Sequence, residues 1–161
     1  MQQQLIFHNK PMTITLSAAA EQQAQQLSVP LIIEVQVYFS CLLGKRIAYY
    51  STEQQPGIWQ LDDAEFAALL PQAQKLSGAV YVRFNTVMTK ACPVSDYAGP
   101  PPVTDFEIKN QAAYVPSWLK LDFKQQQWQG EFGWNASKQG QANTKQLRAA
   151  PTARAALSIE R

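Results

Sequence analysis

The chain has few of the residues that most often carry chemistry. Only 16% of its 161 residues are charged, and it holds one histidine and two cysteines; a typical globular protein has about 25% charged residues. No apolar run approaches the roughly 18 residues of a membrane span, and the opening MQQQLIFHNKPMTITL lacks the basic start and apolar core of a signal peptide. We therefore expect no membrane contact and a cytoplasmic location, where cysteines stay reduced.

Several motifs for ligand binding and catalysis are also missing. The seven glycines form neither GxGxxG nor GxxxxGK, so no phosphate-binding loop is predicted. The candidate zinc donors Cys41, Cys92, His8 and Asp96 show no C-x2-C or H-x3-H spacing. His8 is the single possible carrier of histidine-based catalysis. It lies in an N-terminal stretch that gives no strand signal, and we expect it to be a mobile surface residue.

Glutamine supplies much of the polar surface, as in MQQQ, EQQAQQ and FKQQQWQ. The net charge of +2 is unevenly distributed, because residues 138–161 hold five basic side chains against one acidic side chain, Glu160. The rest of the chain is therefore slightly acidic. Nucleic-acid binding usually requires a concentrated basic surface, so we do not expect a nucleic-acid partner.

Two helices are predicted. Ser17 is a suitable N-cap for the alanine-rich stretch that follows, in which Ala20, Ala24 and Leu27 share one face. Asp62 and Glu65 have the spacing of a capping box for a second helix that we extend to Leu76. Pro71 lies inside this stretch and predicts a kink or an early end. Phe66, Leu69, Leu70 and Ala73 would form its buried stripe.

About seven strands are predicted, since apolar and polar residues alternate along many short segments. The clearest is LIIEVQVYF at 31–39, and a turn at SCLLGK, with Gly44 at positive φ, would lead into the return strand RIAYYS. The others are 12–16, IWQL, GAVYVRFNTVM, VTDFEI, WLKLDF and the final hairpin FKQQQWQGEFGW.

This order of elements predicts an α+β fold, a single β-rich domain with a mainly antiparallel sheet and about two covering helices. The domain would span residues 1–135, and residues 136–161 would form a basic, flexible C-terminal tail. CPVSDYAGPPP at 92–102 holds four prolines and predicts a long irregular loop. Loops of this length are commonly functional or tie parts of a fold together.

Cys41 lies in the predicted turn after residue 39. Lys45 and Arg46 follow it closely and would lower the pKa of an exposed thiol, favouring a thiolate that binds metal or attacks an electrophile. The alternative is a small apolar side chain packed under the turn beside Leu42 and Leu43.

A family resemblance rests on the same region. ITLSAAAEQQAQQL, followed by LIIEVQVYFSCLLGKRIAYYS, resembles the opening of the A-type (HesB-like) iron–sulfur carriers: a strand, a Ser-capped helix, a strand, a cysteine loop and a return strand. The resemblance implies a metal or cluster site at Cys41. It covers roughly 40 residues; SCLLG replaces the family's GCSG-type loop, and Cys92 stands in place of a C-terminal cysteine pair. Two thiolates per chain could hold an iron–sulfur cluster across a dimer, since a cluster needs four ligands.

Two further groups were weighed as sites. Asp96, Asp105 and Glu107 surround the proline-rich loop and could form an acid pair, although two solvated acids on an exposed strand face are the commoner arrangement. Trp118, Trp128, Phe132 and Trp134 could form a stacking platform. The last three alternate with Gln129, Glu131 and Gly133 as in a half-buried strand, so we expect them to pack in the core.

Three functions therefore stay open. The favoured one is a non-catalytic binding or adaptor protein with a groove beside residues 92–102 and a protein partner, a second copy of the chain being one option. The second is a metal or iron–sulfur carrier with Cys41 and Cys92 as ligands. The third is an enzyme with Cys41 as its nucleophile.

Overall fold

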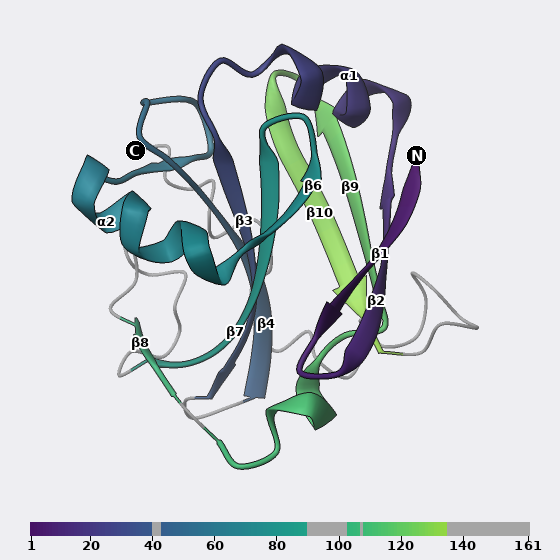
Figure 1. The fold of residues 1–161 in the computed structure, drawn as a ribbon, viewed down its shortest axis with the longest axis vertical. Coiled ribbons are helices and arrows are strands. Elements are labelled where there is room, and N and C mark those ends of the chain that lie inside the picture. Colours follow the sequence, from purple (N-terminus) through teal and green to yellow (C-terminus); the bar gives the residue numbers. More distant parts are fainter. Residues whose placement is uncertain (40–42, 90–102, 107, 135–161) are drawn as a thin grey trace.

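A computed structural model describes residues 1–39, 43–89, 103–106 and 108–134 (Figure 1). The helices are α1 (Ala18–Gln26) and α2 (Asp63–Leu69), with 3-10 helices at Leu70–Gln72 and Gln111–Tyr114. The strands are β1 (Gln2–Phe7), β2 (Lys10–Leu16), β3 (Leu31–Phe39), β4 (Leu43–Ser51), β5 (Trp59–Gln60), β6 (Gln74–Ser77), β7 (Val80–Thr89), β8 (Val103–Asp105), β9 (Trp118–Lys124) and β10 (Gln127–Gly133).

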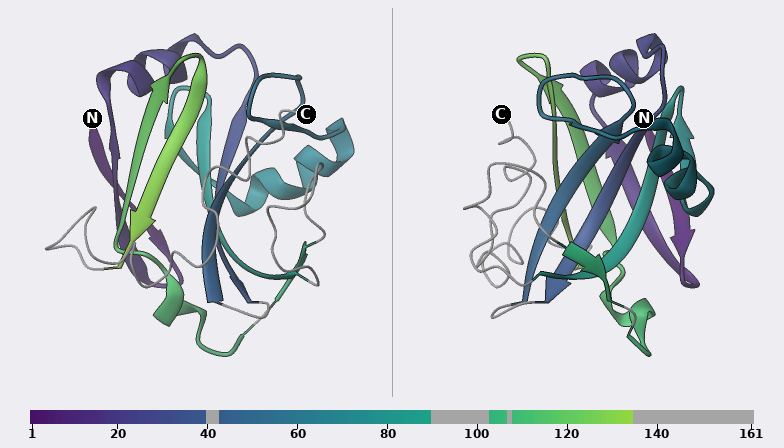
Figure 2. Two further views of the ribbon diagram at one scale, coloured as in Figure 1. Left: turned by 180° about the vertical axis from the view of Figure 1, so that it is seen from behind. Right: turned by 90° about the vertical axis from the view of Figure 1, so that its left-hand side faces the viewer.

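The strands form two mixed sheets that face each other (Figure 2). Sheet A has the order β1-β2-β9-β10, and sheet B has the order β5-β4-β3-β7-β6, with β8 also paired to β7. Parallel pairing occurs at β2–β9, β3–β7 and β4–β5, and the other pairs are antiparallel. The predicted class, β-rich α+β with mainly antiparallel pairing, is confirmed.

The core lies between the sheets, where the inward residues of both have almost no exposed surface. Each such side chain contributes about 1.5–3 kcal/mol of transfer free energy. They include Met12, Ile14, Leu119, Leu121 and Phe132 from sheet A, and Ile33, Val35, Ile47 and Val82 from sheet B. The sheets approach closely at one side, where a Cβ built on Gly130 of β10 would lie 2.8 Å from Cδ1 of Ile47 in β4. The predicted core role of Trp128, Phe132 and Trp134 is confirmed.

Both predicted helices are present, with their predicted caps. The Ser17 hydroxyl accepts from the Ala20 N–H at 3.1 Å and donates to Oδ1 of Asp122 at 2.6 Å, so one side chain both starts α1 and joins it to β9. Asp62 and Glu65 form the capping box of α2. Within the described residues, no helix is long and apolar enough to cross a membrane.

Two local predictions are wrong, while the early end predicted for the second helix at Pro71 is confirmed. The N-terminal stretch around His8, which was expected to be mobile, forms strand β1. This strand pairs with β2 through a tight turn at His8 and Asn9, whose φ angles are 51° and 66°. The second helix ends near Pro71, and Gln74–Ser77 forms strand β6 because proline cannot continue the hydrogen-bonded helix. Gly44 lies within β4 opposite Tyr38 rather than at a positive-φ turn position.

The predicted division at residue 135 stays a prediction. The described part of the chain ends at Trp134, and the expected tail 136–161 lies outside it.

Candidate functional site

A groove of about 570 Å³ lies where the tip of the β1–β2 hairpin meets the free edge of sheet B. We call it the amide-lined groove. One wall comes from the hairpin tip, and the other walls come from the segments around β6, β7 and β8. Its lining residues are Ile6, Phe7, His8, Gln72, Gln74, Arg83, Phe84, Asn85, Asp105, Phe106 and Gln111.

The groove lies beside a gap in the pairing of β7, between the part that pairs with β6 and the part that pairs with β8. Strand β6 pairs with β7 as far as Val82, and β8 pairs with it from Val87 onward. Between these points the Phe106 N–H donates to the Thr86 carbonyl at 2.9 Å. Within the described chain, residues 83–85 therefore have no strand partner on the groove side.

Three side-chain amides in the groove each donate one hydrogen bond to the protein. The Gln74 amide donates to the Ile6 carbonyl at 2.6 Å, the Asn85 amide to Oδ1 of Asp105 at 2.9 Å, and the Gln111 amide to the Thr86 hydroxyl at 2.8 Å. These bonds fix the orientation of the amides. Among the described residues, nothing donates to their three carbonyl oxygens.

Behind the groove, four polar side chains cross the outer face of sheet B. We call Arg83, Glu34, Gln36 and Arg46 the polar ladder. Arg83 forms an ion pair with Glu34, the Gln36 amide donates to Oε1 of Glu34 at 2.5 Å, and Arg46 donates to Oε1 of Gln36 at 2.5 and 2.9 Å. Each of the four is at most 5% exposed, so the ladder is a buried network rather than a solvated surface.

The ladder holds two guanidinium groups and one carboxylate. Burial lowers the pKa of Arg46, partly offset by Tyr50 and Tyr38, and Arg46 lies 5.7 Å from the Tyr38 ring. Burial also lowers the pKa of Arg83, while the charge of Asp105 raises it. Nη1 of Arg46 and Nε of Arg83 are buried, and no group of the described residues accepts a hydrogen bond from either. Because such groups are costly to bury, we expect substitutions in the ladder to destabilise the fold.

Arg83 connects the ladder to the groove. Its Nη1 binds Glu34, and its Nη2 donates to Oε1 of Gln72 at 2.7 Å. The remaining Nε is inaccessible to solvent. The Arg83 charge is therefore compensated inside the protein and is not free to bind an anion in the groove.

Aromatic rings add apolar surface to the groove. The His8 ring stands edge-on to Phe84, with ring centroids 6.0 Å apart. Phe106, which also lines the groove, packs on Phe39 at 5.3 Å between centroids. The site thus combines hydrogen-bonding oxygens with aromatic side chains, as ligand pockets generally do.

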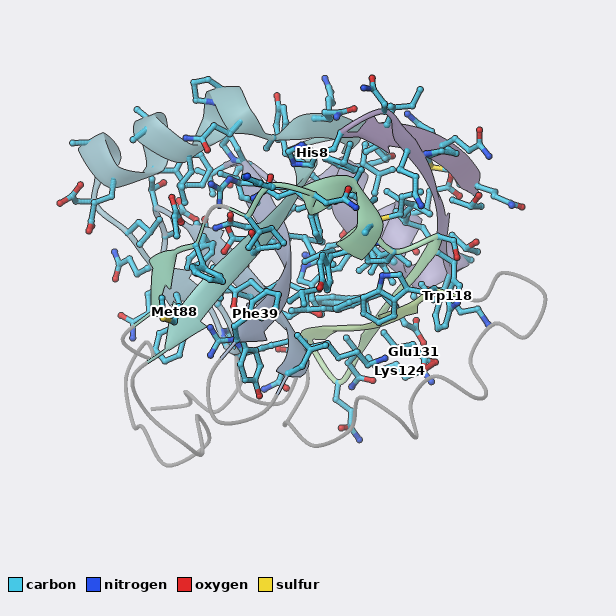
Figure 3. The ribbon with its side chains drawn as sticks, turned by 90° about the horizontal axis from the view of Figure 1, so that it is seen from below. His8, Phe39, Met88, Trp118, Lys124 and Glu131 are labelled. Atoms are coloured by element: carbon cyan, nitrogen blue, oxygen red, sulfur yellow. The ribbon has the colours of Figure 1, made fainter. Side chains whose placement is uncertain are left out.

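A second hollow of about 480 Å³ lies on the outer face of sheet A, lined by Thr15, Ser17, Lys120, Leu121, Asp122, Lys124, Gln129, Gly130 and Glu131. Its charged side chains are of both signs: Lys124 lies 3.2 Å from Asp122, and Lys120 is opposite Glu131 across β9 and β10. Figure 3 shows Lys124 and Glu131 well away from His8. The second hollow therefore presents charges of both signs, whereas the amide-lined groove presents one exposed carboxylate, Asp105.

The predicted site residues have different outcomes. Cys41, Cys92, Asp96 and Glu107 lie outside the described residues. His8 and Asp105 both line the groove, which corrects the expectation that His8 lies in a stretch without structure. The described residues contain no group of three or more His, Cys, Asp or Glu side chains able to hold a metal ion.

The sequence suggested that Lys45 and Arg46 lie exposed beside a hairpin tip, but both side chains are buried. They lie inside β4 and point to opposite faces, since alternate residues of a strand do so. The Lys45 amine is buried between the sheets, where it donates to the Phe132 carbonyl at 2.5 Å. Burial lowers the pKa of Lys45, and Glu131 opposes this shift.

Sequence reasoning missed the four amide side chains of the groove. Gln72, Gln74, Asn85 and Gln111 come from separate segments, and glutamine elsewhere in this chain is an ordinary surface residue. The one available signal was the expectation of a groove beside residues 92–102, because Asp105 and Phe106, which follow those residues in the chain, line the observed groove. Comparison with protein-family models, curated proteins and solved structures finds no match for this chain.

Proposed function

We propose that this chain is a non-catalytic binding protein whose ligand occupies the amide-lined groove. The observation that carries the proposal is the coincidence of the gap in β7 pairing with three oriented amides whose carbonyl oxygens accept no bond from described residues. Buried or half-buried hydrogen-bonding groups are usually satisfied. A ligand in the groove can donate to these oxygens in place of water.

A groove-filling variant tests this proposal. Asn85→Trp places a large ring in the groove, and Gln129→Trp places the same ring in the second hollow as a matched control. A fragment library screened by saturation-transfer NMR should contain compounds that bind the wild type and the control but not Asn85→Trp. If no compound shows that pattern while both variants remain folded, the groove is not a binding site.

A protein partner, expected from the sequence, has a candidate surface at β1. Among the described residues, this strand is an outer strand of sheet A with no further strand paired to it. Met1 and Leu16 exchange two backbone hydrogen bonds, at 2.9 and 3.1 Å. The alternation of antiparallel pairs then points the backbone groups of Gln2, Gln4 and Ile6 away from β2. The segment QQQLIF carries no charged side chain, and uncharged edges favour pairing with another strand.

We include a second copy of the chain as the partner for this edge. Antiparallel pairing about a two-fold axis at Gln4 would place Gln2 opposite Ile6 of the other copy. There it would replace the Gln74 amide at the Ile6 carbonyl and cover the Ile6 side chain, which is 58% exposed. The carrier and thiol-enzyme functions depend on Cys41 and Cys92 and stay predictions, as do the cytoplasmic location and the expectation of no nucleic-acid partner.

A further inference from the structure

The geometry points to a cationic hydrogen-bond donor, a primary amine or a guanidinium on an apolar stem, as the ligand of the amide-lined groove, with Asp105 as its counter-ion. This inference rests on the proposed function and names the chemical class of the ligand.

The groove offers hydrogen-bond acceptors as well as donors. Each amide side chain has one acceptor oxygen and two N–H donors. Gln74, Asn85 and Gln111 each use one N–H within the protein, so each retains its whole carbonyl oxygen. Gln72 is engaged at both ends, since its amide donates to the Ala68 carbonyl and its oxygen accepts from Arg83. Three amide oxygens, and one N–H of each of these amides, therefore remain for a ligand.

The accessible charge in the groove is negative. Arg83 pairs with Glu34 and also interacts with the charge of Asp105, and its remaining Nε is closed to solvent. Asp105 is exposed, and its Oδ1 accepts from Asn85 while its Oδ2 accepts no bond from described residues. A carboxylate that is held in place by one hydrogen bond is an effective partner for an ammonium or guanidinium group.

The surroundings also favour an apolar stem behind the charged group. Ile6 is more than half exposed at the hairpin tip, and Phe84, Phe106 and His8 line the same groove. A ring or alkyl stem can pack there while its cationic end reaches Asp105. An anionic ligand would instead face the Asp105 carboxylate, which repels it.

Three probes of similar shape separate charge from fit: phenethylamine, phenethyl alcohol and phenylacetate. Their affinities for the wild type are measured by NMR titration, following the single histidine, His8, and the side-chain amide of Asn85. The amine should bind at least about tenfold more tightly than the alcohol, and phenylacetate should not bind. Asp105→Asn should lower the amine's affinity to that of the alcohol, and Glu131→Gln, in the second hollow, should leave it unchanged.

The outcomes separate the two proposals. If the alcohol or phenylacetate binds as tightly as the amine, and Asn85→Trp abolishes that binding, the groove is a binding site but the cationic ligand class is wrong. If Asp105→Asn leaves the amine's affinity unchanged, Asp105 is not the counter-ion. If the Asn85→Trp screen yields no groove ligand and none of the three probes binds, both proposals are overturned.

Discussion

Glu34 is the residue on which the polar ladder depends most. It is the single carboxylate of the ladder and binds both Arg83 and Gln36. Removing its charge leaves two buried guanidinium groups with no anion in the ladder. We expect Glu34→Gln to lower the free energy of unfolding by about 3–5 kcal/mol, the usual cost of breaking a buried ion pair, as measured by urea denaturation.

The double variant Glu34→Met with Arg83→Met is the control for this prediction. Replacing a buried pair by apolar side chains of similar size is often neutral, so the double variant should be clearly more stable than Glu34→Gln. Equal losses in the two proteins would mean that the ion pair is not what stabilises this face of sheet B.

Tyr38 gives the fold a pH dependence at the alkaline end. Burial raises the pKa of Tyr38 to about 12, and the charge of Arg46 opposes this shift. Because the folded-state pKa lies above the unfolded value of about 10, the stabilisation is complete below pH 10 and is lost as the pH rises toward 12. At 1.36 kcal/mol per pKa unit, the loss from Tyr38 is roughly 2–3 kcal/mol.

Tyr38→Phe removes this group. Urea denaturation at a series of pH values from 8 to about 11.5 should show a shallower fall in stability for the variant than for the wild type. Parallel curves for the two proteins would contradict the assignment. Tyr49 and Tyr50, whose pKa values burial also raises, keep part of the alkaline loss in both proteins.

At the scale of elements, the contact of α1 with the β6–β7 turn depends on Gly78. This glycine has φ of +54°, and a Cβ built on it would lie 2.3 Å from the Ala24 carbonyl oxygen. We expect Gly78→Ala to cost more than about 2 kcal/mol, because backbone strain and a backbone clash add. Gly57 has φ of +76°, and a Cβ built on it would meet no atom nearer than 3.9 Å. A substitution there therefore measures backbone strain without a clash.

Gly57→Ala should cost only about 1 kcal/mol, the strain of a positive φ alone. Both variants are compared by thermal and urea unfolding. If Gly78→Ala is no more destabilising than Gly57→Ala, then α1 is not held against the turn as closely as the structure indicates.

Elements with strong local signals were predictable from the sequence. The caps at Ser17 and Asp62 and the alternation in β3, β7 and β10 are determined by hydrogen-bonding side chains and by apolar spacing within a few residues. Strand β1 was missed because its three glutamines obscure the alternation, in which Leu5 and Phe7 alone face the core. Strand β6 was missed because Gln74 and Lys75 are equally compatible with a helix.

The candidate site was less predictable than the fold. His8 and Asp105 were singled out for their chemistry, but their meeting in one groove depends on the packing of sheet A against sheet B. The division of the strands into two sheets cannot be inferred from strand patterns, since inward residues alternate in the same way in one sheet and in two. The polar ladder was also hidden, because Glu34 and Gln36 read as ordinary exposed positions of a half-buried strand.

At the scale of the whole molecule, the free edge of β1 predicts self-association. The Gln4 N–H points away from β2, so Gln4→Pro removes an edge donor without breaking a bond of the sheet. If two copies pair through β1, analytical ultracentrifugation should show a dimer for the wild type and for Gln4→Ala, and a monomer for Gln4→Pro. A wild type that stays monomeric at 100 μM, or a Gln4→Pro variant that still dimerises, would contradict pairing through this edge.

The measurement that tests the central claim most directly is a chemical-shift map of ¹⁵N-labelled protein titrated with phenethylamine. If the amide-lined groove is the binding site, the side-chain amide signals of Gln74, Asn85 and Gln111 and the backbone signals of residues 83–86 should move together. Thr15 and Gln129 in the second hollow should not. Shifts centred on Thr15 and Gln129, or no shifts at millimolar ligand, would contradict the account.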